Sequence, residues 1–507
     1  MFIVTYIYTL IDESESSVGV NMVDCNLDES ISQFSRLVND ALDCLGYSAE
    51  QIQLRSDIFP DLYRKLSDKC NNLFGHDMVL SGSRLDGVPL ACSDTDLLLL
   101  YKDVICVEEG HGEEGLTVLE TRMQDCLPGY TKLHARSLCE TDINGLLERS
   151  TVNIVSNGVD QFLVSSTVFL NEICTLFSYA QPLQNHITFD DKTSNGPAVT
   201  ITLSMRNPIT NTSVAEECDM VPALPIYLRD TLKEWTNRQR YHDWPPPEVV
   251  LDVLATEACL VAISLSECKD AHLEWRICFP QGEKRLLHSL NEVQLKVYVL
   301  LKMVKREIIS KVSDGITSYM MKNVIMWVCE GMPSALFIPE FLVDRLKNAL
   351  HFIKVCIVNN FLPCYLIPQR NLLLGKLEGH NKYLVLNILS ELIDSNAAYL
   401  LQCNSLSEAL VLSYKHPIVA INAKLARNQL ELLFLTSHQR VLNSMDWESI
   451  IHEDAVWFWL DTLLQDPWFI SYTTNLINIL GFDFLLKVLD PRCAGQIKKL
   501  RQRALLS

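Results

Sequence analysis

The spacing of apolar residues predicts helices near both ends of the chain and strands between them. From Ile31 to Cys70 the apolar residues recur at the three- and four-residue intervals of an amphipathic helix. Four short apolar or alternating runs predict strands, namely Met78–Leu80, Leu97–Tyr101, Phe162–Val168 and Ala198–Met205. Helices combined with strands in this way predict a fold of the α+β class.

The run Trp244-Pro245-Pro246-Pro247 marks a break, because proline removes amide donors and restricts the residue before it. We expect a lobe boundary there and almost entirely helical structure beyond it. Between Leu286 and Ile308 the apolar residues step by four, three, four, three, four and four, which predicts one amphipathic helix. The leucine-rich stretch from about residue 380 to 507, with breaks at His416-Pro417 and Asp466-Pro467, predicts a further all-helical unit.

Composition and charge narrow the class of protein. The 507 residues are 48% hydrophobic and 21% charged, which excludes a disordered tail, a collagen and a coiled-coil rod. The net charge of −19 argues against a general nucleic-acid binder, since lysine and arginine supply most affinity for phosphate backbones. The charge is uneven, because the first fifty residues hold nine acids and one base. Residues 283–322 hold eight bases and four acids, so the overall negative charge does not exclude a local basic groove there.

Cysteine usage and hydropathy predict a cytoplasmic protein. The 17 cysteines are scattered, with no CxxC, which is typical of reduced intracellular thiols. The apolar start Met1–Ile11 lacks a basic region and a cleavage site, so we expect no signal peptide. The most apolar candidate span, Phe352–Pro368, is interrupted by lysine, asparagine and proline, so we expect no membrane insertion.

Two short motifs carry the candidate chemistry. The predicted strand at Met78–Leu80 leads into Gly82-Ser83, whose amides and hydroxyl suit a phosphate. Asp94 and Asp96 then enter the next strand, where residues two apart point to one face. Like-charged carboxylates side by side repel unless they share a cation, and oxygen ligands suit Mg²⁺ or Mn²⁺. An Asp-x-Asp pair is also common by chance, and a Gly-Ser turn next to a strand is commoner still.

A third carboxylate, Asp219, follows the predicted strand Ala198–Met205 among apolar residues. Burying a carboxylate is costly unless it is paired or binds a metal. Asp219 is therefore a candidate ligand, and the alternative is a turn residue before Pro222.

The chain resembles the cyclic GMP-AMP synthase-like receptors of the male-abnormal (Mab) family, which have a nucleotidyltransferase fold. The resemblance lies first in Gly82-Ser83, Asp94-x-Asp96 and the segment Asp219–Ala223. Further landmarks of the family follow in order over roughly residues 30–375. They are Trp244-Pro245-Pro246, Glu274–Phe279 with Glu283-Lys284, Asn291–Gln294, Ser318–Lys322 and Cys364–Pro368.

The resemblance implies a role for each site residue. It assigns Gly82 and Ser83 to the donor triphosphate, and Asp94, Asp96 and Asp219 to two Mg²⁺ or Mn²⁺ ions. It assigns Arg276 to the acceptor nucleotide. In the helical part it implies nucleotide contacts from Lys302, Lys305, Ser318 and Tyr319, with the Tyr319 ring stacking on a base. Lys302, Lys305 and Arg306 lie three and four apart on the predicted helix, off its apolar stripe. A solvated basic face is the alternative for these three residues, and a core aromatic is the alternative for Tyr319.

Two departures from the family pattern matter. Asp94 stands where cyclic GMP-AMP synthase itself has glutamate. The zinc-binding thumb of that enzyme needs one histidine and three cysteines, but residues 287–301 hold His288 and no cysteine. We therefore expect no structural zinc, which argues against the DNA-sensing branch of the family.

The resemblance predicts a bilobal nucleotidyltransferase fold of the α+β class, and the helical spacing beyond its end adds a helical extension. The predicted ranges are an acidic N-terminal segment with the start of a long helix (1–55), a nucleotidyltransferase core (56–243), a helical lobe (244–378) and an additional helical unit of open role (379–507). The implied function is the joining of ATP and GTP into a cyclic dinucleotide for a downstream receptor in innate immunity. An activator such as double-stranded RNA or another ligand would switch the enzyme on. The alternative is a catalytically silent Mab-family interaction protein.

Overall fold

The computed structural model describes residues 25–74, 76–90, 93–101, 103–108, 117–124, 126–137, 145–156, 159–179, 187–189, 197–207, 212–228, 231–263, 270–395, 397–444 and 471. The chain divides into two compact units, and each is described by itself. The helical unit comprises Met1–Ala49, Arg229–Thr256 and Gln281–Lys424. The sheet unit comprises Glu50–Leu228, Glu257–Pro280 and Leu425–Ser507. The predicted break at Asp466-Pro467 and the start Met1–Ile11 lie outside the described residues.

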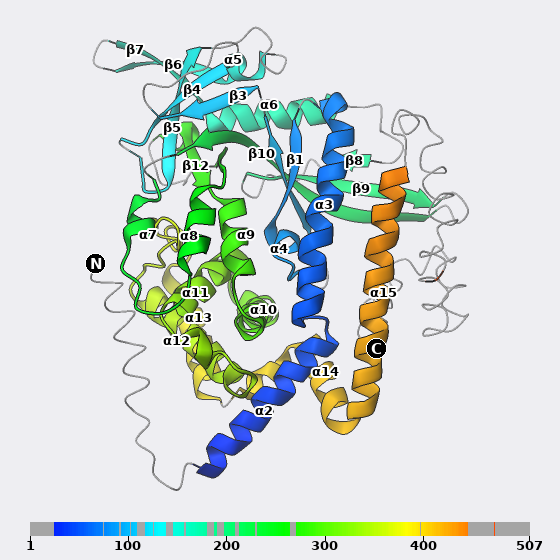
Figure 1. Cartoon of the computed structure of the whole chain (residues 1–507). Helices are drawn as coiled ribbons and strands as arrows, with labels where there is room; N and C mark the ends of the chain where they lie inside the picture. Colours follow the sequence, from blue (N-terminus) through cyan, green and yellow to red (C-terminus); the bar gives the residue numbers. More distant parts are fainter. Residues whose placement is uncertain are drawn as a thin grey trace. The chain divides into compact units, whose positions relative to one another are not determined.

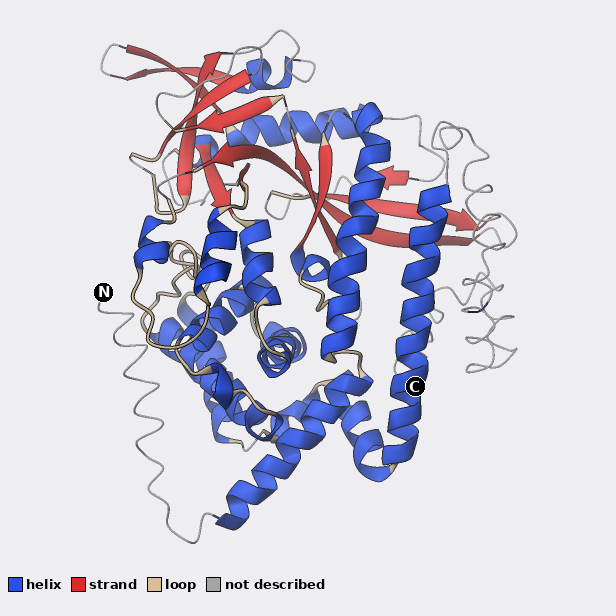
Figure 2. Ribbon diagram, in the orientation of Figure 1, coloured by secondary structure: helices blue, strands red, loops and turns tan. Residues whose placement is uncertain are grey.

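Strands of the sheet unit join in one mixed sheet (Figures 1 and 2). Its described strands are β1 (Asp77–Ser81), β2 (Thr95–Leu100), β3 (Val104–Val107), β4 (Thr117–Arg122), β5 (Tyr130–Ser137), β6 (Thr151–Ser156), β7 (Val159–Val164), β8 (Ile187–Phe189), β9 (Val199–Asn207), β10 (Thr212–Tyr227), β11 (Ala258–Val261) and β12 (Glu274–Cys278). The main path runs β1-β2-β10-β11-β12-β5-β4-β3, and β10 also pairs with β3. The alternation of side chains along β1, β2 and β10 gives this part of the sheet two apolar faces.

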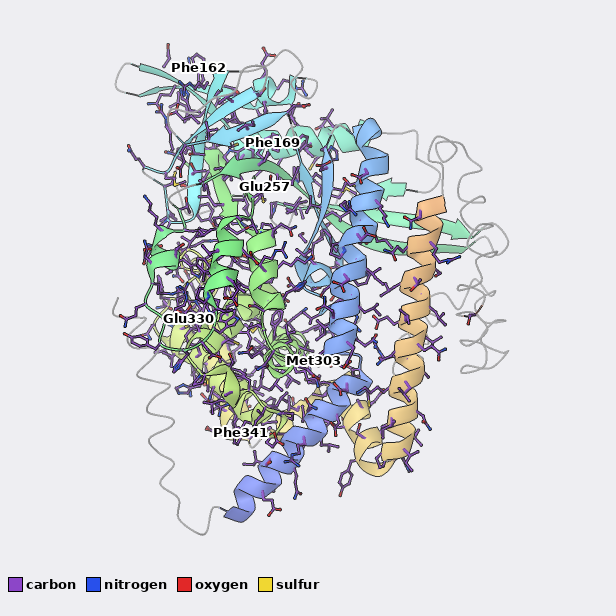
Figure 3. All side chains as sticks on the ribbon, viewed as in Figure 1. Phe162, Phe169, Glu257, Met303, Glu330 and Phe341 are labelled. Carbon is purple, nitrogen blue, oxygen red and sulfur yellow. The ribbon has the colours of Figure 1, made fainter. Side chains whose placement is uncertain are left out.

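Helices and turns of the sheet unit are α3 (Ala49–Phe74), α4 (Gly82–Leu85), α5 (Leu146–Ser150), α6 (Ser166–Tyr179), the 3₁₀ turn η3 (Ala271–Leu273) and the part of α15 (Pro417–Ser444) beyond Lys424. On one face of the sheet, Phe59 and Tyr63 of α3 pack on a core that includes Leu80 and Leu97. Farther along the sheet, the ring of Phe169 on α6 lies 5.1 Å from that of Trp275 on β12 (Figure 3).

The described elements of the helical unit are all helices and 3₁₀ turns. They are α2 (Cys25–Cys44), α7 (Lys233–Asn237), α8 (Pro247–Leu254), α9 (Pro280–His288), α10 (Glu292–Glu307), η4 (Ile309–Lys311), α11 (Ser318–Glu330), η5 (Ser334–Leu336), η6 (Pro339–Phe341), α12 (Leu342–Val358), α13 (Gly379–Asp394), η7 (Ala398–Gln402), α14 (Asn404–Lys415) and the start of α15. Helix α10 is central, since it contacts α2, α11 and α12. Its side chains from Val293 to Val304 are all buried.

A buried ionic cluster holds the helical unit together around Glu330 of α11 (Figure 3). Its carboxylate accepts hydrogen bonds from Arg238 at 2.6 Å and from the Tyr365 hydroxyl at 2.7 Å. The Arg238 guanidinium also lies 4.3 Å from the centroid of the Trp327 ring. Burial raises the pKa of Tyr365 well above its usual value, and the charge of Glu330 raises it further. Tyr365 therefore stays a hydroxyl that donates to Glu330.

The structure corrects two of the predicted helices. The single helix expected over Ile31–Cys70 is divided into α2 and α3, because Gly46 adopts a positive φ of 84°. The amide of Tyr47 bonds the carbonyl of Leu42 there, which closes α2 with a Schellman-type end. The single helix expected from Leu286 to Ile308 is also two, α9 and α10, because Asn291 caps α10 through a capping box with Gln294.

One strand is shorter than expected. The strand expected over Phe162–Val168 ends at Val164, and α6 begins at Ser166. Beyond the proline run the described elements are helices and 3₁₀ turns, as expected, except for β11 and β12, which return to the sheet. The Trp244-Pro245 peptide bond is cis and lies inside the helical unit. The four consecutive sequence ranges stay a prediction, whereas the two compact units each combine distant parts of the chain.

The cysteines whose side chains the structure describes are free thiols rather than disulfides, and most of them are buried. Burial raises the pKa of the Cys356 thiol to about 12, which keeps it protonated at neutral pH. Within the described ranges, none of the helices combines the length and the apolar character that a bilayer crossing requires.

Candidate active site

Asp96 lies at the centre of the candidate site, on the second residue of β2. In the sheet register Asp96 pairs with Ser81 of antiparallel β1 on one side and with Asp219 of parallel β10 on the other. Register partners on neighbouring strands project to the same face, and adjacent strands lie about 4.8 Å apart. Both carboxylates are half-buried. The fold therefore places two acids of distant sequence side by side, at the end of one sheet face.

The apolar residues farther along the same strands explain why these acids stay at the end of the face. Leu98 and Val221 follow Asp96 and Asp219 by two residues, so they share their face, and both belong to a core with Ala223 and Val261. Leu97, between Asp96 and Leu98, points to the opposite face and packs with the residues under α3. The carboxylates thus occupy the open end of an otherwise apolar row.

Gly82 brings the backbone of the candidate phosphate turn against Asp96. Its φ is +66°, and an added Cβ would lie 2.6 Å from Cγ of Asp96, which is closer than real atoms approach. A side chain cannot be accommodated at this position without displacing the carboxylate. Ser83 follows on α4, where its carbonyl accepts a hydrogen bond from the Val88 amide at 3.2 Å. The structure thus brings the turn that starts at Gly82 against Asp96, and the binding of a phosphate by Gly82-Ser83 stays a prediction.

Asp219 is oriented by a residue that the sequence analysis missed. The hydroxyl of Thr200 on β9 donates a hydrogen bond of 2.7 Å to Oδ1 of Asp219, its register partner. The alternating pattern of Val199, Ile201 and Leu203 is the sequence signal that could have pointed to Thr200. In a strand, such a pattern predicts that Thr200 projects to the face away from the apolar positions. Only the pairing of β9 with β10 shows that this face is the one with the carboxylates.

Asp94 lies just before β2 and is exposed. Among the described residues, no three His, Cys, Asp or Glu side chains come together as a metal-binding group. The fold therefore pairs Asp96 with Asp219, and the inclusion of Asp94 in the same ligand set stays a prediction. The carboxylate oxygens of the pair are the donor type that Mg²⁺ and Mn²⁺ prefer, and the missing side chain of Gly82 lets the backbone of the turn approach Asp96 closely.

Arg276 lies on β12 in the sheet unit, where it pairs in register with Tyr130 of β5 and Val261 of β11. It is half-buried, and its Nε donates to the sulfur of Cys278 at 3.3 Å. The predicted contact of Arg276 with an acceptor nucleotide is not tested by this arrangement.

The other predicted nucleotide-binding residues belong to the helical unit. Lys302 is only 3% exposed, and its ammonium lies 5.3 Å from the ring centroid of Tyr298. The alternative of a solvated basic face is therefore wrong for Lys302, which is buried together with the other α10 residues from Val293 to Val304. Lys305, near the end of α10, is half-buried.

Ser318 and Tyr319 begin helix α11. Ser318 is exposed, and Thr317 before it caps the helix. The Tyr319 hydroxyl donates to Glu283 of α9 at 2.8 Å, and Lys322 approaches the other oxygen of Glu283 at 3.4 Å. Glu283 is a further residue that the sequence analysis assigned no role beyond a family landmark. It fixes the orientation of the Tyr319 ring that the resemblance assigns to base stacking.

A glycine turn packed against register-paired carboxylates on a mixed sheet suits a nucleotidyltransferase, and comparison with protein families agrees. Residues 98–289 match the Mab-21 protein nucleotidyltransferase domain, and residues 287–390 match the Mab-21 protein HhH/H2TH-like domain. The chain belongs to the Mab-21 family, which confirms the resemblance and the α+β nucleotidyltransferase fold.

The matched ranges cover only some of the candidate site. Asp219 and Arg276 lie in the nucleotidyltransferase match, and Lys302, Lys305, Ser318 and Tyr319 lie in the HhH/H2TH-like match. The nucleotidyltransferase match begins after Gly82, Ser83, Asp94 and Asp96, and the second match ends before α14 and α15.

Proposed function

We propose that this chain is a metal-dependent nucleotidyltransferase that joins ATP and GTP into a cyclic dinucleotide. The observation that carries the proposal is the row formed by Ser81, Asp96 and Asp219, with Gly82 packed against the Asp96 carboxylate. This row combines a donor of backbone amides for phosphate with two adjacent anionic oxygen ligands for divalent cations.

The acidic residues of the candidate site and Thr200 each have a defined part in the proposed reaction. In each transfer a ribose hydroxyl forms a bond to the α-phosphorus of the donor, pyrophosphate leaves, and the hydroxyl proton is released. Asp96 and Asp219, with Asp94, would hold two Mg²⁺ or Mn²⁺ ions, which when bound would offset phosphate charge and make the hydroxyl more acidic. Thr200 keeps the Asp219 carboxylate in one orientation.

The remaining assignments follow from the family resemblance and are part of the proposal. Gly82 and Ser83 contact the donor triphosphate, Arg276 contacts the acceptor, and Tyr319 stacks on a base. Lys302, Lys305 and Ser318 are assigned to the phosphates. In a cytoplasmic setting the product would act on a cyclic-dinucleotide receptor in innate immune signalling, after activation by double-stranded RNA or another ligand.

The test is incubation of the full chain with Mn²⁺, ATP and GTP, with and without double-stranded RNA or DNA, followed by chromatography of the products. We expect a metal-dependent cyclic product that the double variant Asp96→Asn with Asp219→Asn no longer makes. Asp103→Asn is the matched control, because Asp103 is an exposed acid away from the carboxylate row. Unchanged turnover in the double variant would refute the assigned site.

The activator is identified by the response of the same reaction to salt. A nucleic-acid activator releases counterions when it binds, so activation should fall steeply between 50 and 200 mM salt. Activation that does not respond to salt would indicate a protein or a small ligand instead.

A second candidate function is a catalytically silent interaction protein that keeps the fold. The engagement of the Tyr319 hydroxyl with Glu283 and the burial of Lys302 favour it, since both groups already have structural roles in the helical unit. This candidate would be supported if the incubation yields no product under any condition and a separate titration detects no metal-dependent nucleotide binding.

A further inference from the structure

Helix α15 lies beyond both family matches, yet in the sheet unit it packs along α3 (Figure 1). The contact is made by Glu431 of α15 and Arg55 of α3, which are 376 residues apart in sequence. Nε and Nη2 of Arg55 donate to the two carboxylate oxygens of Glu431 at 2.6 and 3.0 Å. This bidentate geometry is the strongest form of an arginine–carboxylate pair.

The pair is buried and its charges are held in place. The Arg55 side chain is 3% exposed and that of Glu431 is 15% exposed. Arg427, one turn earlier on α15, also binds Glu431 at 2.9 Å. Burial alone would raise the pKa of Glu431, but Arg55 and Arg427 bring it below its ordinary value, so the carboxylate is ionised at neutral pH.

The remaining donor of Arg55 reaches the candidate phosphate turn. Its Nη1 donates to the carbonyl of Gly87 at 3.3 Å, and Gly87 closes the turn that begins at Gly82. Gly87 lies directly on α3, since an added Cβ would be 2.7 Å from the carbonyl oxygen of Ile52. One guanidinium thus connects α15 to the backbone of the turn.

A second arginine carries the connection from the turn to the start of β2. Arg84, on α4, lies 5.8 Å from the centroid of the Phe59 ring of α3 and donates to the carbonyl of Ser93 at 3.3 Å. Ser93 directly precedes Asp94. The turn is therefore fixed between α3 and the segment that leads into the carboxylate row.

We propose that Arg55 is a positioning residue for the Gly82–Gly87 turn and that Glu431 of α15 holds Arg55 in place. This inference rests on the proposed function, in which the turn binds the donor triphosphate. Helix α15 is then a working part of the nucleotidyltransferase unit. When Glu431 is absent, the Arg55 guanidinium loses its fixed orientation, the Gly87 carbonyl loses its donor, and the turn becomes mobile.

The test compares Glu431→Gln and Arg55→Lys with Gln439→Ala in the full chain. Gln439 is a matched control, because it joins the same two helices by donating to Asp61 of α3 at 2.7 Å, two turns farther along α15. Hydrogen–deuterium exchange is measured on peptides covering residues 82–90 and, as an internal reference, residues 212–227. In the first two variants we expect faster exchange at residues 82–90 and unchanged exchange at the reference residues 212–227. In Gln439→Ala we expect wild-type exchange at both.

The kinetic readout separates positioning from general stability. Because the turn holds the triphosphate in the ground and transition states alike, we expect the KM for ATP to rise about 5- to 10-fold with kcat within twofold of wild type. Wild-type exchange at residues 82–90 in both variants, or an equal increase in Gln439→Ala, would overturn the inference. If exchange rises as expected but wild-type protein has no turnover, the connection stands and the proposed function fails.

Discussion

Thr200 donates a hydrogen bond of 2.7 Å to Asp219, the residue opposite it in the antiparallel pair β9–β10. A ligand carboxylate that accepts such a bond has one oxygen fixed and the other left to face a cation. Thr200 is therefore the residue whose change should affect the carboxylate row without altering its charge.

Thr200→Val tests this relationship because valine keeps the shape of threonine and removes the hydroxyl. We expect metal-dependent turnover, or Mn²⁺ affinity measured by titration, to fall about 10- to 100-fold, as for other residues that orient metal ligands. Thr200→Ser restores the donor and should recover most of the loss. Equal defects in Val and Ser variants would show that the methyl group, rather than the hydrogen bond, is what matters.

Gly82→Ala should destabilise the protein and disturb Asp96. The new Cβ would overlap the Asp96 carboxylate, and its backbone has a positive φ, so we expect a loss of about 1–3 kcal/mol in the free energy of unfolding. Gly379→Ala is the control, since Gly379 also has a positive φ of 52° but nothing within 4 Å of the added Cβ. Urea unfolding of both variants separates overlap from backbone strain. Equal losses in the two would remove the case for close contact at Gly82.

Tyr319→Phe removes the hydroxyl that donates to Glu283 and keeps the aromatic ring. We expect a loss of about 1 kcal/mol in stability, because Lys322 still approaches Glu283. If the ring stacks on a base, nucleotide affinity should stay within a few-fold in Tyr319→Phe and fall in Tyr319→Leu. Binding titrations with ATP and GTP distinguish the two variants, and equal affinities would place the ring in the core instead.

Local patterns in the sequence identified the strand that carries the site. The apolar run Leu97–Tyr101 correctly predicted a strand directly after Asp96, which is β2 from Thr95 to Leu100. The alternating run near residue 199 is likewise β9. These features depend on neighbours in sequence, so period and turn composition suffice to find them.

Features that depend on contacts between distant parts of the chain could not be predicted from local periodicity. Lys302 is buried with every residue of α10 from Val293 to Val304, whereas helical spacing records only one apolar stripe. The pairing of Arg55 with Glu431 joins residues 376 positions apart and follows no local periodicity. By contrast, the break at Asn291 had a local signal, the capping box with Gln294, which the longer apolar period obscured.

Lys296 of α10 ties the N-terminal helix α2 to the helical unit, and its side chain is fully buried. Its ammonium lies 2.6 Å from Asp43 and 2.5 Å from Glu292, and it donates to Asn39 at 2.8 Å. Lys424 of α15 also binds Asp43, at 2.8 Å. Asp43 is therefore shared by lysines from two different helices.

Lys296→Met should cost about 2–3 kcal/mol of stability, below the usual range for a broken buried pair, because Asp43 keeps Lys424. The exposed Lys415→Met on α14 is the control and should change stability by less than about 0.5 kcal/mol. Adding Asp43→Asn to Lys296→Met should cost less than the sum of the single changes, since the two groups interact directly. Additive losses in denaturant unfolding would contradict the shared network.

Glu431 makes the stability of the sheet unit depend on pH in a defined direction. Arg55 and Arg427 hold the pKa of its buried carboxylate below the ordinary value of 4.5. A lowered pKa contributes stability that is complete above the unfolded-state pKa and is lost as the pH falls through the folded-state value.

We expect Glu431→Gln to be destabilised most at pH 7. The gap between the free energies of unfolding of this variant and of the wild type should narrow below about pH 5. Urea unfolding at pH 7, 4.5 and 3.5 measures the gap across the range in which the carboxylate is protonated. The exposed Glu408→Gln should show a small gap at every pH. A gap for Glu431→Gln that stays constant with pH would mean that its packing, not its charge, stabilises α15.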